Sequence, residues 1–286
     1  MSFSHLHVHT TYSRFDGMSD IEELFKRAES LGQPGLAITD HGSTMGVREF
    51  FEKSRFHPSV KPVAGCEFYL TAGDHRDHSD KKAQRYHLIL LAKNLTGYRN
   101  LSRLDYIARH EGFCVRPRID HGLLERYHEG LVAMSACIGG EIPQAIIEED
   151  DMDYARELTL WYRDLFGDDF FLEVSQHESR KPDYTGDLLQ WQKKANEGIF
   201  TLGKELGIGV VATNDVHFVN KEDARAHDLM LCERTGNSID DPNRFMYTGE
   251  EYLKSEAEMM EVFSGHPEVV GNTDDVLKKL YIYELS

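Results

Sequence analysis

Short apolar segments recur along the chain and alternate with longer amphipathic stretches. Several of the short segments are bounded by glycine or proline, as buried strands commonly are. The pattern predicts seven strands, over residues 5–10, 35–40, 61–71, 86–94, 130–137, 170–177 and 209–215. Apolar residues at helical spacing predict helices over residues 19–32, 185–207, 221–234 and 250–264.

The order of these elements predicts the class of fold. Strands that alternate with helices are typical of parallel βα units, which build a wound sheet or a barrel. The first helix is expected to begin at Ser19, with Glu22 completing a capping box. No repeat, low-complexity tract or Gly/Ser linker divides the 286 residues, so we expect one α/β domain over residues 1–286.

Cysteine usage and charge narrow the class of protein. The four cysteines are widely separated and form no CxxC pair, which argues against a disulfide framework and favours a reducing cytoplasm. No run approaches the length of a membrane span and no signal peptide is recognised, so no membrane partner is expected. The net charge of −17 argues against a protein that coats nucleic acid, although bound cations could still hold a phosphate substrate.

The chain opens with an alternation of histidines, His5-Leu6-His7-Val8-His9, which places three imidazoles on one face of a strand. His7 and His9 close that strand, whereas His5 begins it and is expected to be structural or solvated. Other metal-binding side chains stand mostly at or just after the C-terminal ends of later strands, and in a βα barrel those ends converge on one face. These metal-competent side chains are His7, His9, Asp16, Asp40, His41, Glu67, His87, Cys137, Glu173, Gln176, His177, Asp215 and His217.

Such donors indicate a polynuclear metal site. Imidazole and thiolate suit zinc and other borderline metals, while carboxylates also accept manganese, iron or magnesium. The donors exceed the four of one tetrahedral site, so we expect two or three divalent ions, which would orient a phosphate and activate a water. No Ser-His-Asp order or GxGxxG motif competes, and the segment CIGGE at 137–141 lacks the lysine and spacing of a P-loop.

Some of the remaining candidates have competing interpretations. Cys137 alone would be a typical small buried residue, but its position at a strand end favours a ligand. His177 is interpreted as a substrate contact rather than a ligand or a residue that orients a ligand. Arg14, Arg116 and Arg118 either contact a phosphate or lie in solvated loops.

Other residues are predicted to take no part in the chemistry. Phe15 and the tyrosines are assigned to core or loop packing rather than to base stacking. The polar stretch 72–85 is expected to be a solvated loop. The predicted surface histidines are His75, His78, His110, His121, His128 and His266, and the predicted core cysteines are Cys66, Cys114 and Cys232.

Several segments together resemble the polymerase and histidinol phosphatase (PHP) domain family. They are HLHVHTTYSRFDG, AITDHGSTMGVREFF, KPVAGCEFYL, YHLILLAKNLTGYRNL, RPRID, GLVAMSACIGGEIP and VVATNDVHFVNKEDARAHDLML. The likeness covers essentially the whole chain. TGYRNL, the cysteine of SAC and EDARAH are marks of the branch found at the N-terminus of the bacterial DNA polymerase III α subunit.

The resemblance implies a distorted seven-stranded (β/α)7 barrel, similar to a TIM barrel, with a polynuclear metal centre. The family's ligand positions match His7, His9, Asp16, His41, Glu67, His87, Cys137, Asp215 and His217. The implied activity is 3′→5′ exonuclease proofreading on a DNA 3′ end. The implied cofactors are two or three divalent ions, with zinc or manganese favoured and iron or magnesium as alternatives.

The resemblance suggests a catalytic hypothesis and two alternatives. Asp16 or Glu67 would bridge ions that bind the scissile phosphate, and His177 or an arginine such as Arg118 would steady it. The alternatives are a structural or interaction module stabilised by metals, and a pyrophosphatase or small-molecule phosphatase. Because α subunits continue into further domains, we expect an excised cytoplasmic domain, with a free-standing homologue as the alternative. The expected partners of the excised domain are the remaining polymerase domains and replisome subunits.

Overall fold

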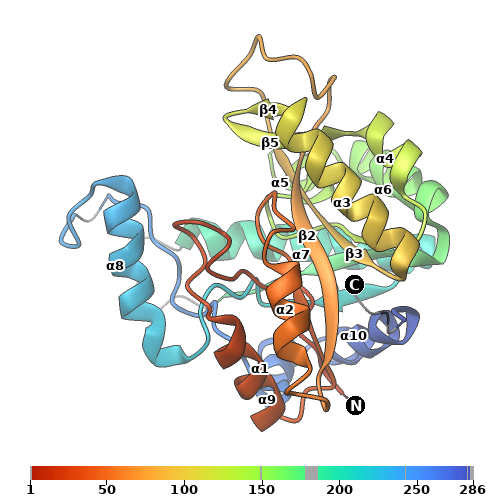
Figure 1. Cartoon of the computed structure of the whole chain (residues 1–286). Coiled ribbons are helices and arrows are strands. Elements are labelled where there is room, and N and C mark those ends of the chain that lie inside the picture. Colours follow the sequence, from red (N-terminus) through yellow and green to blue (C-terminus); the bar gives the residue numbers. More distant parts are fainter. Residues whose placement is uncertain (1, 149, 178–185, 242, 282, 284–286) are drawn as a thin grey trace.

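Figure 1 shows a computed structural model of the chain, in which a curved sheet is surrounded by helices. The structure describes residues 2–148, 150–177, 186–241, 243–281 and 283. The strands are β1 (Gly35–Ile38), β2 (Lys61–Thr71), β3 (Tyr86–Ala92), β4 (Phe113–Cys114), β5 (Arg116–Asp120), β6 (Leu131–Met134), β7 (Phe170–Val174) and β8 (Val210–Ala212). The helices are α1 (Ile21–Ser30), α2 (Val47–Ser54), α3 (Leu95–His110), α4 (His121–Tyr127), α5 (Glu141–Ile147), α6 (Met152–Phe166), α7 (Gly186–Leu206), α8 (Ala224–Thr235), α9 (Glu256–Val262) and α10 (Glu268–Lys279). None of the helices within these ranges is long and apolar enough to span a membrane.

The sheet runs in the order β1-β2-β3-β6-β7-β8. The pairs β1–β2, β6–β7 and β7–β8 are parallel, whereas β3 is antiparallel to both of its neighbours, β2 and β6. The hairpin of β4 and β5 extends the sheet, because β5 pairs in parallel with the last residues of β2. The chain is therefore a mixed α/β fold rather than a uniformly parallel one.

The N-terminal segment closes the sheet toward a barrel. Residues 5–9 lie between β1 and the chain that follows β8. Isolated bridges join His5 to Leu36 and Val8 to Val216, in place of a regular first strand. All seven predicted strands take part in the curved sheet, and the expected distorted seven-stranded α/β barrel is confirmed.

The direction of β3 follows from the loop before it. Residues 72–85 contain no helix, so the chain returns directly beside β2, and a direct return gives an antiparallel pair. β3 therefore starts at the rim where the parallel strands end. This reversal brings His87, near the start of β3, to the same rim as the residues that end the other strands.

Alternate side chains of the strands enter two different parts of the core. Leu88 and Leu90 of β3 pack beneath the helices, whereas Ile89 and Leu91 join a second cluster inside the curved sheet. Leu277 of α10 closes that inner cluster near the starts of β1 and β2. The core is therefore sealed at the end opposite the rim on which the strands deliver the candidate ligands.

The helix predictions are confirmed for α7 and α8, although residue 185 lies outside the described residues. The helix predicted over 250–264 begins only at Glu256, because the chain before it runs extended beside the segment that follows β8. The capping box predicted at Ser19 is also wrong. Asp20 caps α1 instead, and its side chain accepts the backbone N–H of Glu23.

Candidate metal centre

The loops after the strands bend sharply where candidate ligands stand. Phe15, Ala136 and Asp215 have φ angles of 61°, 62° and 44°. Non-glycine residues adopt this left-handed region at a cost, and such strain is concentrated at functional sites. The bends present Asp16, Cys137 and Asp215 at the rim of the barrel.

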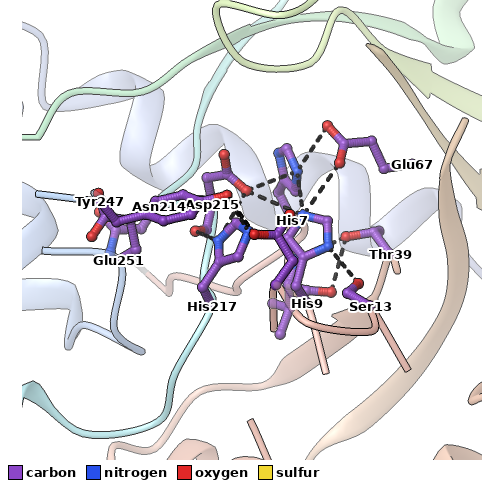
Figure 2. Close-up of polar contacts among 12 residues, drawn as sticks. His7, His9, Ser13, Thr39, Glu67, Asn214, Asp215, His217, Tyr247 and Glu251 are labelled. Carbon is purple, nitrogen blue, oxygen red and sulfur yellow. Dashed lines mark hydrogen bonds and ion pairs between the residues drawn. The ribbon is translucent and has the colours of Figure 1, made fainter. Parts of the chain in front are cut away.

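Four side chains from three segments of the chain meet at the centre of this rim (Figure 2). Nε2 of His7 lies 3.2 Å from Nε2 of His9, and Oδ1 of Asp215 lies 3.1 and 3.2 Å from these two nitrogens. The carboxylate oxygens of Glu67 lie 3.4 Å from Nε2 of His7 and 3.3 Å from Nε2 of His9. These side chains come from the N-terminal segment, β2 and the loop after β8.

The separations fit ligand atoms around a shared cation. With bonds of about 2.0–2.1 Å, the ligand atoms of a tetrahedral zinc site are about 3.3 Å apart. Both oxygens of Glu67 and Oδ1 of Asp215 are buried without a hydrogen bond of good geometry. Buried carboxylate oxygens are costly unless they are paired, and a cation between these groups would satisfy them. The donor set therefore fits a divalent metal ion.

His41 and His87 extend the cluster on the other side of Glu67. Nδ1 of His41 lies 2.6 Å from one oxygen of Glu67, and Nδ1 of His87 lies 2.8 Å from the other. Nε2 of His41 lies 3.1 Å from Oδ2 of Asp16. Glu67 thus contacts four imidazoles, and His41 reaches two carboxylates, which is a geometry suited to more than one ion.

His217 lies against the same group of residues. Its ring centroid is 4.4 Å from that of His9, and nitrogens of His9, His41 and His217 lie within 4.8 Å of one another. The hydroxyl of Tyr247 contacts two residues of the cluster. It lies 3.0 Å from Nε2 of His217 and 3.3 Å from Oδ1 of Asp16. His9, His41 and His217 therefore form a third group of possible ligands, beside the group of His7, His9 and Asp215 and the group of His41, Glu67 and His87.

The thiol of Cys137 also belongs to this rim. Burial and the nearby carboxylates of Asp215 and Glu67 raise the pKa of Cys137 well above its usual value. A bound cation would act in the opposite sense, because the thiolate is the form that ligates. The contacts described above join eight of the nine positions implied by the resemblance, and Cys137 lies near enough to Asp215 and Glu67 to be affected by their charges. The binding of metal by all nine stays a prediction.

Buried partners orient two of the imidazoles. Nδ1–H of His7 donates to Glu173 over 2.7 Å. Nδ1–H of His9 donates to the Ser13 hydroxyl over 2.9 Å, and that hydroxyl donates to Asp40 over 2.7 Å. Each Nε2 lone pair is then free to face the cluster, as in carboxylate–histidine–metal arrangements. Glu173 and Asp40 were counted among the metal-competent side chains, but in the structure they position ligands.

The charges in the cluster offset one another. Burial would raise the pKa of Glu67, but the imidazoles of His87 and His41 hold it well below its usual value. Burial would lower the pKa of His7, but Asp215 and the other nearby carboxylates raise it well above its usual value. The buried carboxylates thus favour the protonated form of His7, whereas a metal ion would bind its neutral form and supply the balancing charge itself. Metal binding is therefore expected to release protons.

His177 does not face the cluster as a substrate contact would. It is buried, its Nε2–H donates to the carbonyl oxygen of Asn214 over 3.1 Å, and its Nδ1 accepts from Gln192 over 3.0 Å. Both ring nitrogens are used within the protein. The expected substrate contact is therefore corrected to a positioning role for the loop that presents Asp215.

Arg118 also has a structural role. The segment RPRID forms β5, and Arg118 is only 1% exposed. Its guanidinium donates to the carbonyl oxygens of Gly112, His75 and Asp77 over 2.7–3.1 Å. Since backbone carbonyls use these donors, the predicted phosphate contact by Arg118 is wrong.

The two other candidate arginines are exposed near the rim. The guanidinium of Arg116 lies 5.7 Å from the ring centroid of Tyr69, which itself stacks 5.9 Å from the ring of His41. Arg14 lies in the loop just before Asp16. Both remain available to contact a phosphate.

The predictions for the remaining histidines and cysteines have mixed outcomes. His5 is buried and structural, with Nε2–H donating to the backbone carbonyl oxygen of Lys254 over 2.8 Å. His75 is buried against Asp120 at 2.6 Å, so its predicted surface position is wrong. His78, His110 and His266 are exposed, His121 and His128 are partly buried, and Cys66, Cys114 and Cys232 are buried as predicted.

Two residues near the site were missed because they lie outside the predicted strand ends. Arg234 of α8 contacts Oδ1 of Asp16 over 2.9 Å, and Tyr247 follows in the next loop. Figure 1 shows α8 beside the N-terminal loop, at one side of the barrel. No local signal marks these residues, because their partner Asp16 is more than 200 positions away in the sequence.

A family model for the PHP domain matches residues 5–177, which is more than half of the chain. The chain belongs to the PHP family. The resemblance identified from the sequence motifs is thereby confirmed. Asp215 and His217 lie beyond the matched range, but the structure places them beside His7 and His9 of the PHP match.

Curated relatives of this PHP chain include bacterial proteins named DNA polymerase III subunit alpha. The DNA polymerase III subunit alpha of Borreliella burgdorferi is 40% identical over 280 residues, and that of Treponema pallidum is 42% identical over 277 residues. The alignments cover 97% and 96% of this chain but 23% of each relative. The chain thus corresponds to less than a quarter of their length.

Solved structures give a more distant likeness. A protein from Bifidobacterium adolescentis described as a metal-dependent phosphoesterase superposes with a TM-score of 0.49 at 14% identity, over 92% of this chain and 96% of its own. At this score the likeness does not bear on function.

Proposed function

We propose that this PHP domain is a metal-dependent phosphodiesterase that removes nucleotides from the 3′ end of DNA. The observation that supports it most is the convergence of imidazole nitrogens and carboxylate oxygens at the spacing of ligand atoms around shared ions. The choice of DNA as substrate rests on the relatives, which are DNA polymerases. A 3′-end nuclease in such an enzyme would serve proofreading.

The proposed cofactors are two or three divalent ions, with zinc or manganese favoured. When bound, such ions bind a phosphate and make water a nucleophile near neutral pH. The proposed ligands are His7, His9, Asp16, His41, Glu67, His87, Cys137, Asp215 and His217. Glu67 contacts four imidazoles and is therefore the best placed carboxylate to bridge ions, with Asp16 as the second.

The chain's other residues prepare the site for a phosphodiester. Glu173 and Ser13 fix the imidazoles of His7 and His9, so that the phosphate meets ligands that need no reorganisation. Arg116, exposed beside the ring of Tyr69, would offer its guanidinium to a phosphate oxygen. The overall charge of −17 opposes DNA binding, so the bound cations, together with Arg116 and Arg14, must supply the local attraction for a phosphate.

We further propose that the domain works within a longer polymerase chain in the cytoplasm. Its partners would be the remaining polymerase domains and replisome subunits, as the names of the relatives suggest. Those domains would deliver the 3′ end to the PHP rim.

The test compares three phosphoesters under one metal loading. The purified chain, with manganese or zinc added, is offered 5′-labelled single-stranded DNA, pyrophosphate and p-nitrophenyl phosphate. We expect stepwise nucleotide release from DNA that His9→Ala or Asp215→Ala abolishes and that His266→Ala, at an exposed histidine, leaves unchanged. Preferential hydrolysis of pyrophosphate, or a metal-loaded protein that hydrolyses nothing and unfolds on chelation, would contradict the proposal.

A further inference from the structure

Two phenylalanine side chains are exposed beside the metal cluster. Phe15 is 53% exposed and Phe245 is 47% exposed. The sequence predicts core or loop packing for Phe15, and the structure places it in a loop with about half of its side chain exposed, outside the core. Large aromatic side chains exposed at the mouth of a site commonly mark a binding surface.

The position of Phe15 is fixed by the same contacts that fix Asp16. Arg234 donates to the carbonyl oxygen of Phe15 over 3.2 Å and to the Asp16 carboxylate over 2.9 Å. The backbone N–H of Asp16 donates to the carbonyl oxygen of Ser13 over 2.9 Å. Phe15 is held in the left-handed region, with φ 61°, while its ring stays in solvent. This strained backbone holds a ring that is about half exposed, and strained backbone is concentrated at functional positions.

Phe245 is linked to Asp16 and His217 through Tyr247. Its ring centroid lies 5.4 Å from that of Tyr247, in an edge-to-face arrangement. The Tyr247 hydroxyl contacts both Asp16 and His217. The preceding residue, Arg244, is buried and pairs with Asp228 of α8 over 2.5 Å. Both exposed rings are therefore anchored to residues that touch Asp16.

A cation also lies at one of the rings. The guanidinium carbon of Arg14 is 5.5 Å from the ring centroid of Phe15. Arg14 is exposed, so its charge is open to solvent and to an approaching phosphate. An aromatic face with an adjacent guanidinium is the combination with which proteins bind single-stranded nucleic acid.

We propose that Phe15 and Phe245 form a platform on which the bases of a single-stranded 3′ end stack while its phosphodiester lies at the metal cluster. This inference rests on the proposed function and extends it, because it selects nucleotides over phosphates that have no base. Phenylalanine has no polar group with which to read a base edge, so the platform accepts any base. Pyrophosphate would gain nothing from two hydrocarbon rings.

The experiment removes the ring from the protein and the base from the substrate in turn. The two substrates are a single-stranded oligonucleotide with an ordinary 3′-terminal nucleotide and the same strand with an abasic 3′ terminus. The variants are Phe15→Ala and Phe245→Ala, with Phe15→Tyr as the conservative replacement. Phe56→Ala is the matched control, because Phe56 is 76% exposed but follows α2 at the far end of the barrel.

We expect Phe15→Ala to lower kcat/KM on the ordinary strand about tenfold, the size of one lost base stack, and to change little on the abasic strand. Phe15→Tyr should restore the ordinary rate, and Phe56→Ala should leave both rates unchanged. Equal losses on the two strands would overturn the inference, since the ring would then act on something other than the base. If Phe15→Ala loses metal, Phe245→Ala decides the question, because Phe245 is not next to a proposed ligand.

A binding measurement separates this inference from the proposed function. Fluorescence anisotropy of the same two strands, labelled at the 5′ end, gives dissociation constants for the metal-loaded protein and each variant. A wild-type chain that hydrolyses neither strand contradicts the nuclease, but selective weakening of the ordinary strand by Phe15→Ala still supports the platform. Unchanged binding of both strands by both alanine variants would overturn the inference, since the rings would then hold no base.

Discussion

Glu173 offers the sharpest perturbation of the metal centre that leaves every proposed ligand in place. One of its oxygens accepts from Nδ1–H of His7 over 2.7 Å and from the Thr213 hydroxyl over 2.6 Å. Its side chain is fully buried, and its second oxygen has no hydrogen-bond partner. Glu173→Gln keeps the size of the side chain but removes the charge that fixes the His7 imidazole.

The expected loss of metal affinity in Glu173→Gln follows from the two orientations that the new side-chain amide can take. If its oxygen faces His7, the NH2 group occupies the position of the unpartnered oxygen and is buried without an acceptor. If it is turned around, the hydrogen bond to His7 is lost. In either orientation His7 becomes a weaker and less ordered ligand. Loss of such an orienting carboxylate weakens metal affinity about 10- to 100-fold, or about 1.4–2.7 kcal/mol.

Metal affinity is measured by competition with a chromophoric zinc chelator, and hydrolysis is measured on single-stranded DNA in the same preparation. The matched control is Glu141→Gln. Glu141 is also buried and accepts from an imidazole and a hydroxyl, those of His121 and Tyr162, each over 3.0 Å. These partners lie on α4 and α6, so the control should lose stability without losing zinc.

Two results would refute the reasoning about Glu173. Zinc affinity that is unchanged in Glu173→Gln would show that His7 needs no orienting carboxylate or binds no metal. Equal losses of affinity in Glu173→Gln and Glu141→Gln would show that general destabilisation, rather than the His7 contact, lowers the affinity.

Three further predictions concern other parts of the account. Arg118→Met should lower the free energy of unfolding by about 2–4 kcal/mol, because three backbone carbonyls lose their donor, and it should not change the amount of bound metal. Urea denaturation measures the loss of stability. Lost hydrolysis at unchanged stability would instead give Arg118 a catalytic role. Cys137→Ser should weaken zinc more than manganese, because thiolate is the softer ligand, and equal weakening in titration calorimetry would exclude the thiol from the site. Chelation should lower the melting temperature, since a metal present at 1,000 times its Kd stabilises the native state by about 4 kcal/mol, and an unchanged melting curve would contradict tight binding.

The sequence predicted the barrel well because most of its strands are buried on both faces, so that each is a short, continuous apolar run. Each buried run had a clear boundary, and the ligand-bearing residues follow from where those runs end. His7 and His9 share a face because alternate residues of an extended segment point the same way. His5 has the same parity but lies farther from the rim, where it donates to the carbonyl oxygen of Lys254. His87 fits the same rim only because β3 runs antiparallel, which strand order alone does not predict.

The errors have one physical origin, which is contact between segments far apart in the sequence. Arg118 is in a polar segment, but carbonyls of residues 75, 77 and 112 surround its guanidinium. His75 lies in a polar loop that folds back onto Asp120. Ser19 forms a bridge with Thr10, which leaves Asp20 to cap α1. Local pattern cannot reveal such partners, because it reports which residues are polar but not which groups will satisfy them.

The central claim is that the gathered residues form a polynuclear metal centre, and metal stoichiometry tests it most directly. Elemental analysis of the purified chain, paired with a 3′-end release assay on the same sample, should give two or three divalent ions per chain together with hydrolysis. Glu67→Ala, which removes the carboxylate that contacts four imidazoles, should reduce the count to one or none and abolish release. One ion or none in the wild-type chain, or a Glu67→Ala protein with full metal content and undiminished release, would contradict the account.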